Sequence, residues 1–440
     1  MFSIKGKAIL FIFTALALAG CEQNQRTSQN SQVLQNTNTN TEIPVNAQPN
    51  AAVPQNAAVP VTLPVIDAMF SDEGFIQEAK TAVQLSDEEL IKIRDAARNA
   101  VLELSGEPSE DDARSTRASV EKTKQEIEKI IGPERSTRFF DLIRTRWGGN
   151  DSELATVQPN AIPSDSRIVV NAPAYRMDVF RDGKLTKTYR VGIGYPEFPL
   201  PVGLRKANEI IFNPTWTPPD EPWVKGKVQP GKKVEAGSKL NPLGPIKIPI
   251  GLPSLVHGGK DASRLGTFAS HGCVGLTNAG IQDFARELSA LSGGELTPQE
   301  IKDYEKQKTE TKNVKLDNPV SVELRYETIV VEDGKVIVYR DVYERGTNTE
   351  ENLRKVLQVY GVSLESLPEQ ERRALMTALE KMAVDARGEK VTEPSNSNEN
   401  SEKKNSSSVT RNIKGEKSVI VEVAMLRGKG YPAPLNLVGK

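Results

Sequence analysis

The spacing of hydrophobic residues changes along the chain and separates a helical part from a β-rich part. Over residues 65–150 apolar side chains recur at helical intervals, first after the capping-box pattern Ser86–Glu89. Gly132 and the proline after it interrupt a later helical run. From about residue 165 the pattern alternates, as in strands. We predict a small α-helical domain of unknown role, a packing or spacer module in the simplest interpretation and a partner-binding one otherwise, followed by a β-rich domain over 165–346.

Turn and cap residues indicate where the strands and helices of the β-rich domain begin and end. A first hairpin is predicted to turn at Asp182-Gly183, and a second, formed by 320–326 and 335–342, at Asp333-Gly334. The proline-rich stretch 213–253 is expected to form loops and edge strands. One helix is predicted from Asn278 to about Leu291, and another after the cap at Thr297.

The N-terminal residues have the pattern of a secretory signal. Lys5 and Lys7 precede an apolar run over 8–19, too short to span a bilayer as a helix. Small residues then precede Cys21, and this resembles a bacterial lipobox, whose cysteine is acylated and becomes the first mature residue. We expect a lipoprotein signal peptide over 1–20 and lipidation at Cys21. An ordinary signal peptide with an incidental cysteine is the alternative.

Four segments outside the two domains differ in composition. Residues 21–64 are rich in Asn, Gln and Pro and cannot bury enough apolar area to order, so a disordered tether is expected. Residues 350–390 have helical spacing, and 391–412 read as a second disordered linker. The segment 413–440 contains one strand-like run that needs a sheet edge, with the β-rich domain as the candidate.

Charge and cysteine count narrow the function. The 57 lysines and arginines are balanced by 58 aspartates and glutamates, so no basic excess indicates a nucleic-acid partner. The chain has only two cysteines and two histidines, and three of these four residues are His257, His271 and Cys273. If Cys21 carries lipid, Cys273 has no partner for a disulfide within the chain. A thiol beside imidazoles is therefore the candidate chemistry.

An imidazole that takes the proton of a thiol, or stabilises its thiolate, makes the sulfur a nucleophile near neutral pH. Spacing alone does not tell whether His257 or His271 is that base. Gly272 lets the backbone turn tightly, so that N–H groups can face a developing oxyanion. An inert buried cysteine is one alternative. A zinc site is another, although His-Gly-Cys ligates one ion poorly and no CxxC or HExxH pattern supports it; we predict no metal and no cofactor.

The run 256–258, the run 265–274 and Asn278 together resemble the signature of the YkuD-type L,D-transpeptidase catalytic domain. The similarity covers about 165–345. The flanking segments that agree with it are 170–174, 181–184, 213–219, 241–245 and 319–320. The resemblance implies a β-rich domain, of mixed β-sandwich or barrel-like form with a few helices, in a multidomain chain.

The resemblance also implies roles for individual residues. Cys273 is the expected nucleophile and His257 the general base, with the carbonyl of Gly258 orienting the imidazole. His271, Gly272 and the backbone N–H of Cys273 are expected to shape the oxyanion site, and Ser270 to support the turn.

The sequence gives weaker evidence for the residues that contact the substrate than for the nucleophile and the base. Trp216 and Trp223 could wall the site against water, or be plain core, and Asn278 is a further candidate. The family commonly has an arginine two residues after the cysteine, where this chain has Gly275; Arg264 is the candidate to reach the site in its place.

In this family the donor is a peptidoglycan stem tetrapeptide, attacked at the carbonyl of its third residue with release of D-Ala. An amine of a second stem, or of an envelope protein, then resolves the thioester. Exchange of one amide for another needs no ATP, which suits an exported enzyme. The expected location is the cell envelope, anchored by lipid; Glu22 favours the outer membrane facing the periplasm if the organism has two membranes.

Two other functions stay open. An L,D-carboxypeptidase or endopeptidase could use the same site with water as the acceptor, and an inactive protein could serve as a peptidoglycan-binding tether. A papain-like or NlpC-type peptidase is disfavoured because those families place the cysteine before the histidine.

Overall fold

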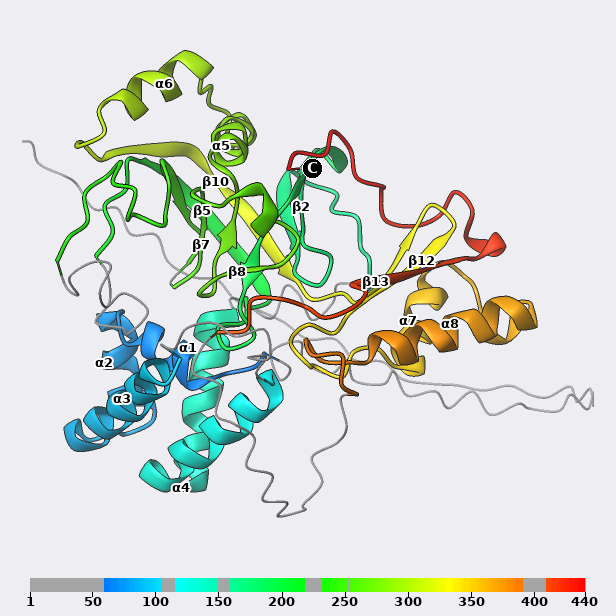
Figure 1. The fold of residues 1–440 in the computed structure, drawn as a ribbon, viewed down its shortest axis with the longest axis horizontal. Helices are drawn as coiled ribbons and strands as arrows, with labels where there is room; N and C mark the ends of the chain where they lie inside the picture. The colour runs from blue at the N-terminus through cyan, green and yellow to red at the C-terminus, as the bar shows by residue number, and fades with distance from the viewer. Residues whose placement is uncertain are drawn as a thin grey trace, which may run out of the picture. The chain divides into compact units, whose positions relative to one another are not determined.

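The computed structural model describes residues 59–104, 115–148, 158–217, 232–251, 253–390 and 409–439. Cys21, Trp223, the predicted signal peptide, most of the predicted tether and most of the 391–412 linker lie outside these ranges. The described residues form an N-terminal helical domain, a central β-rich domain and a C-terminal α/β unit (Figure 1). The predicted β-rich fold preceded by a helical domain is confirmed.

Four helices make up the N-terminal domain: α1 (Leu63–Met69), α2 (Glu73–Ala82), α3 (Asp87–Leu102) and α4 (Thr116–Gly148). The predicted capping box is present, with the Ser86 and Glu89 side chains each accepting a backbone N–H of the other residue. Gly132 has a φ of 79° and divides α4 at a kink, which its successor Pro133 reinforces. The core of the domain is aromatic and branched: Phe75, Ile93, Ile127, Phe139, Ile143 and Trp147.

The helical domain starts earlier than the sequence predicts. Val59, Val61 and Leu63 are at most 3% exposed and belong to the helical core, although they lie in the segment assigned to the tether. Thr62 between them caps α1 and donates a hydrogen bond to the Glu197 carbonyl at 2.7 Å. Alternate valines thus give the end of the Asn/Pro-rich segment enough apolar area to order, which a composition average does not reveal.

The central domain is built on an eight-stranded sheet in the order β3-β2-β1-β10-β5-β6-β7-β9. Strand β1 runs parallel to β10 and β7 parallel to β9, and the other neighbours are antiparallel. The strand bounds are β1 Arg167–Asn171, β2 Arg176–Arg181, β3 Lys184–Arg190, β5 Gly203–Phe212, β6 Ile246–Pro249, β7 Leu255–His257, β9 Val274–Gly275 and β10 Lys312–Arg325.

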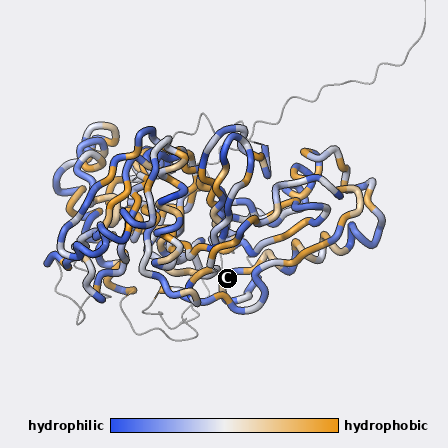
Figure 2. The backbone as a smooth tube through the Cα atoms, turned by 90° about the horizontal axis from the view of Figure 1, so that it is seen from above, coloured by the Kyte–Doolittle hydropathy of each residue, from blue (hydrophilic) through white to orange (hydrophobic). Residues whose placement is uncertain are grey.

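Short elements complete this domain near the nucleophile. Strands β4 (Ile193–Gly194) and β8 (Phe268–Ser270) form a parallel pair, and the 3-10 turn η4 (Ala262–Arg264) precedes β8. Helices α5 (Asn278–Ser292) and α6 (Pro298–Lys306) follow β9, and α5 packs against β10 and β6. Hydrophobic and hydrophilic residues alternate along much of the chain (Figure 2), and the apolar ones from both sheet and α5 merge in one core that includes Ile168, Met177, Phe212, Phe284 and Leu288.

The second predicted hairpin is wrong in one strand. Strand β10, which contains 320–325, lies inside the main sheet between β1 and β5, while the hairpin at Asp333-Gly334 joins β11 (Ile329–Glu332) to β12 (Lys335–Tyr339). The proline-rich stretch also differs from expectation, because its strand β6 is internal to the sheet between β5 and β7. The partners of β10 are far apart from it in the sequence, and so is β5, one of the two partners of β6, so local alternation does not identify these pairings.

The hairpin β11–β12 belongs to the C-terminal unit instead of the central domain. Strand β13 (Ser418–Glu422) pairs with β12, and so adds to this small sheet, not to the main one as predicted. Helices α7 (Glu350–Val359) and α8 (Glu369–Met382) share a core with the three strands, and the 3-10 turns η5 (Leu364–Ser366) and η6 (Ala424–Leu426) connect them.

The last described residues return to the main sheet. Val438 pairs with Tyr189 of β3 in a parallel bridge, and Thr188 and Arg190 exchange backbone hydrogen bonds with this segment. A buried charge cluster fixes the return: the Arg176 guanidinium pairs with Asp178 at 2.8 Å and donates to the Pro432 carbonyl at 2.7 Å. Because breaking a buried pair leaves an uncompensated charge, this cluster specifies where the chain end lies.

Candidate active site

Cys273 lies in the tight turn between β8 and β9. Ser270, the last residue of β8, closes this turn twice: its hydroxyl accepts from the Cys273 N–H at 3.0 Å and donates to the Cys273 carbonyl at 2.5 Å. The expected supporting role of Ser270 is therefore visible as two hydrogen bonds. The same contact corrects an expectation, because the Cys273 N–H already has an acceptor and does not face the cavity as an oxyanion donor.

Gly272 gives the turn its backbone conformation. Its φ of 87° lies in the left-handed region that disfavours residues with a Cβ atom. A Cβ atom there has only the Phe198 carbonyl oxygen within 4 Å, at 3.9 Å. Conformation, and not lack of space, thus requires glycine between His271 and Cys273.

His257 is the last residue of β7, the strand beside β9. In the parallel register Val256 is opposite Val274 and His257 opposite Gly275, so the imidazole is carried by the strand next to β9, and the thiol by the residue just before β9. The His257 Nδ1 atom lies 2.7 Å from the Gly258 carbonyl oxygen. With the proton on Nδ1, this contact is a donated hydrogen bond that leaves the Nε2 lone pair to accept a proton. This is the orienting contact expected of Gly258.

Burial governs the protonation of both groups. Desolvation, helped by the charge of Lys260, lowers the pKa of His257 to about 3. Desolvation also raises the pKa of the Cys273 thiol, and a hydrogen bond from the Leu255 backbone together with the Lys260 charge only partly opposes this. At neutral pH the resting pair is therefore a neutral imidazole and a neutral thiol, so the proton must move to His257 during attack on a substrate.

His271 is held by two aromatic rings. Its ring meets Tyr195 edge-on at 5.1 Å and Phe198 at 4.7 Å between centroids. Burial lowers its pKa to about 3 as well. The aromatic residues stand in the loop after β4, where the Tyr195 N–H donates to the Ser270 carbonyl at 2.9 Å. His271 thus shapes the wall beside Cys273 as a neutral, packed side chain.

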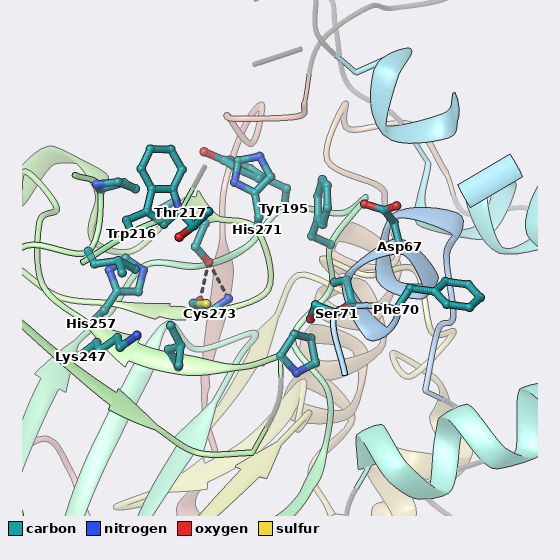
Figure 3. Close-up of a pocket in the computed structure, with 18 of the residues that line it drawn as sticks. Asp67, Phe70, Ser71, Tyr195, Trp216, Thr217, Lys247, His257, His271 and Cys273 are labelled. Atoms are coloured by element: carbon teal, nitrogen blue, oxygen red, sulfur yellow. Dashed lines mark hydrogen bonds between the residues drawn. The ribbon is translucent and has the colours of Figure 1, made fainter. Parts of the chain in front are cut away.

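Cys273, His257 and His271 line one cavity of about 1030 Å³ (Figure 3). Trp216, half-buried, forms part of its wall on the side of His257, and its role in shielding the site stays a prediction. This volume is at the upper end of the range for small-molecule sites, roughly 300–1,000 Å³. The cavity is therefore large enough to hold more than one small chemical group beside the thiol of Cys273.

The helical domain supplies the opposite wall of the cavity. Asp67, Phe70 and Ser71, from the end of α1 and the turn after it, lie across from Trp216 and His257 in Figure 3. From α3, Arg98 lies at the cavity and pairs with Asp67 at 3.2 Å. The helical domain is therefore part of the site, which its sequence did not reveal because these residues lie nearly 200 positions before Cys273.

Two predicted substrate-binding residues have other contacts. The Asn278 side chain accepts a hydrogen bond from the Gly259 N–H at 2.8 Å, which fastens the loop after His257 to the start of α5. The Arg264 guanidinium donates to the Phe268 carbonyl, and Arg264 is not among the residues that line the cavity. Asn278 supports the loop, and Arg264 does not replace the missing arginine.

Sequence reasoning missed Lys260, which lines the cavity and acts electrostatically on Cys273 and both histidines. Because Lys260 follows His257 by only three residues, the sequence could have identified it as a candidate site residue. Nothing in the sequence around Tyr195 and Phe198 indicated that they pack on His271. Within the described part of the chain, no group of three or more His, Cys, Asp or Glu residues is placed to hold a metal ion.

Comparison with known families now identifies the central domain. The family model described as the L,D-transpeptidase catalytic domain, YkuD, matches residues 165–322. Residues 165–322 are thus a YkuD-type L,D-transpeptidase catalytic domain. The match begins just before β1 and ends within β10, and it leaves the helical domain and the C-terminal unit outside. The search of curated proteins found no match to this chain.

Solved structures similar to this chain are L,D-transpeptidases. The catalytic domain of the Enterococcus faecium L,D-transpeptidase is covered completely, with 38% of this chain, 15% identity and a TM-score of 0.24. The enzyme from Mycobacterium smegmatis is covered over 58% of its length, with 37% of this chain, 16% identity and a TM-score of 0.23. For the Ldtfm–avibactam carbamoyl enzyme the match spans 49% of that chain and 37% of this one, at 17% identity and a TM-score of 0.22.

The neutral resting pair predicts the pH dependence of Cys273 alkylation. Because the pKa of the thiol is raised and that of His257 lowered to about 3, the thiolate fraction should grow steadily through neutral pH. We expect the rate with iodoacetamide to rise about tenfold per pH unit from pH 6 to 8, as for any thiol titrating above this range. Peptide mapping by mass spectrometry measures it, with urea-unfolded protein as the reference. A plateau below pH 7 would indicate a thiolate–imidazolium pair instead.

Gly272→Ala tests whether the backbone of the turn positions the nucleophile. The strain of a Cβ at positive φ should lower stability by about 1–3 kcal/mol and slow Cys273 alkylation about 10–100-fold by misplacing the sulfur. Gly361→Ala is the matched control, since Gly361 has a φ of 70° and no atom within 4 Å of its added Cβ. Both variants should lower the midpoint of thermal unfolding. Equal alkylation rates for the two would refute the positioning role.

Proposed function

We propose that this protein is a peptidoglycan L,D-transpeptidase that acts through a Cys273 thioester. The observation that carries the proposal is the pairing of β7 with β9, which sets His257 beside Cys273 at one cavity in a domain of the YkuD family. The donor is a stem tetrapeptide, and the acceptor is an amine of a second stem or of an envelope protein. The products are 3-3 crosslinks or an attached protein.

In the first half-reaction the sulfur of Cys273 attacks the carbonyl of the third stem residue. Nε2 of His257 takes the thiol proton as the carbon–sulfur bond forms, so the charge that appears is an imidazolium and an oxyanion. The carbon–nitrogen bond then breaks, and His257 returns the proton to the amine of the departing D-Ala. His257 suits both steps because a buried neutral imidazole is a base at rest and a strong acid once protonated.

In the second half-reaction the thioester must meet an amine before water. An acceptor amine attacks, His257 takes a proton from it, and the sulfur leaves and recovers that proton. The cavity is bounded by Trp216 on one side and by α1 and α3 on the other, which favours a space that a second peptide fills. Exclusion of water from this space distinguishes transfer from hydrolysis.

Hydrolysis is the second candidate function, since an L,D-carboxypeptidase or endopeptidase needs the same Cys273 and His257. It differs only in the acceptor, which is water. An inactive tether is disfavoured by the intact pair and by the orienting contact at Gly258.

Incubation of the purified full chain with a disaccharide tetrapeptide distinguishes these functions. We expect a crosslinked dimer and free D-Ala by mass spectrometry; tripeptide alone indicates the hydrolase, and unchanged substrate the tether. Cys273→Ala should abolish product formation, and replacement of His257 by Gln should lower the rate about 10²–10⁴-fold, as for loss of a general base. Dimer formation by the Cys273→Ala protein would refute the mechanism.

For the location we propose lipid anchoring through Cys21 to the envelope face of a membrane, the outer membrane in a bacterium that has two. None of the described helices is long and apolar enough to cross a membrane. Anchoring on acyl chains at Cys21, with the Asn-, Gln- and Pro-rich sequence between it and the helical domain as the proposed tether, fits a substrate layer lying off the membrane.

Cys21→Ser tests the anchor without touching the site. We expect wild-type protein expressed in a bacterium to incorporate labelled palmitate and to sediment with membranes, and the variant to do neither. Cys273→Ala is the control for the other cysteine and should keep the label. Label retained in Cys21→Ser would contradict lipidation at this residue.

A further inference from the structure

The Lys260 side chain lies over the position where a residue at 275 would carry its side chain. A Cβ atom built on Gly275 would be 2.8 Å from Lys260 Cγ, 3.0 Å from Cε and 3.4 Å from Cδ. Gly275 is not among the glycines with positive φ, so its backbone conformation does not require glycine. The absence of a side chain at 275 is what makes room for the lysine stem.

The loop that carries Lys260 is fixed at several points. Its own N–H donates to the Leu276 carbonyl at 3.1 Å. The residue before it, Gly259, has a φ of 77° and donates to Asn278 at 2.8 Å. His257 begins the same loop from β7. The backbone of Lys260 is therefore held beside the residue that follows β9 and close to the start of α5, which places the base of its side chain next to Gly275.

The charge of Lys260 is not balanced by a carboxylate. Burial lowers its pKa, and within the described ranges the ionisable groups that act on it are the Cys273 thiol, which is neutral at rest, and the Arg264 guanidinium. A second lysine of the cavity, Lys247, differs because the Glu209 carboxylate acts on it. A half-buried ammonium without a counter-ion is solvated less well than in water, and a bound anion would offset that cost. An ammonium at the nucleophile is thus suited to hold an anionic part of a substrate.

We propose that Lys260 binds the carboxylate of the residue that leaves when Cys273 forms its thioester. The inference rests on the proposed function. In a tetrapeptide donor the terminal carboxylate is only one residue beyond the attacked carbonyl, which suits an ammonium held close to the sulfur. The ligand class is a peptide whose free C-terminal carboxylate follows directly after the scissile bond. Lys260 then selects donors by their length and terminal charge, from the position that an arginine at 275 would otherwise occupy.

A pair of alkylating agents tests the anion site without any assumption about the reaction. Iodoacetate and iodoacetamide both transfer their carbon to the Cys273 sulfur with loss of iodide, and they differ in the carboxylate. At pH 7 we expect the iodoacetate-to-iodoacetamide rate ratio at Cys273 to exceed that of the urea-unfolded protein. Lys260→Met should lower this ratio about tenfold, the order expected from loss of one nearby charge, and Lys260→Arg should restore it.

Two further variants sharpen the result. Lys247→Met removes a cavity lysine that has a carboxylate near it, and the ratio should not change. Lys260→Ala combined with Gly275→Arg moves the cation to the neighbouring strand and should recover the ratio, because the arginine no longer meets the lysine stem. Thermal unfolding confirms that each variant is folded. An unchanged ratio in Lys260→Met overturns the proposal, and so does an equal fall of both rates, which would mean that Lys260 acts on the thiolate alone.

The same variants are then assayed with the tetrapeptide donor. Wild-type protein should process the free tetrapeptide at least tenfold faster than its C-terminal amide, and Lys260→Met should lose that preference. A preference that survives in Lys260→Met would overturn the assignment of the carboxylate. If neither donor reacts with any variant, the proposed function fails, while the alkylation ratio still reports on the anion site.

Discussion

The removal of water from the space around Cys273 is the physical constraint on which the site depends. It lowers the pKa of His257 to about 3, raises that of the thiol and leaves the Lys260 ammonium in a medium that solvates it poorly. The resting enzyme is thus uncharged at its reacting pair and charged only beside it. Since the thiolate is the form that oxidants and adventitious electrophiles attack, a thiol that keeps its proton until a substrate arrives is protected from these side reactions.

The same exclusion of water involves the helical domain. Thr62 and Thr116 donate to the carbonyls of Glu197 and Pro196, in the loop whose aromatic rings hold His271. The Glu197 carboxylate in turn accepts from the N–H and hydroxyl of Thr410, so the segment before β13 is tied to the same loop. A module outside the YkuD match therefore both walls the cavity and supports one of its histidines, and the unit that must fold for catalysis is larger than the catalytic domain.

Local sequence signals predicted local structure well. The capping boxes at Ser86 and Thr297 and the hairpin turns at Asp182 and Asp333 all depend on residues within a few positions of each other. The predictions that failed concern distant partners: β10 joins β1 across some 150 residues, and β13 pairs with β12 some 80 residues before it. The engaged N–H of Cys273 was also beyond reach, because it depends on the rotamer of Ser270.

Gly275 shows why a family motif cannot be transferred one position at a time. Considered alone, Gly275 leaves the cavity without the positive charge of the arginine that the family commonly has at this position. The Lys260 side chain lies across Gly275, so the absence of a side chain at 275 makes room for a cation from the loop after His257. A side chain at 275 would require the stem of Lys260 to shift, so the two positions compete for one space. The residue at 275 can therefore be interpreted only together with the residue at 260. The two residues together determine the charge on this side of the cavity.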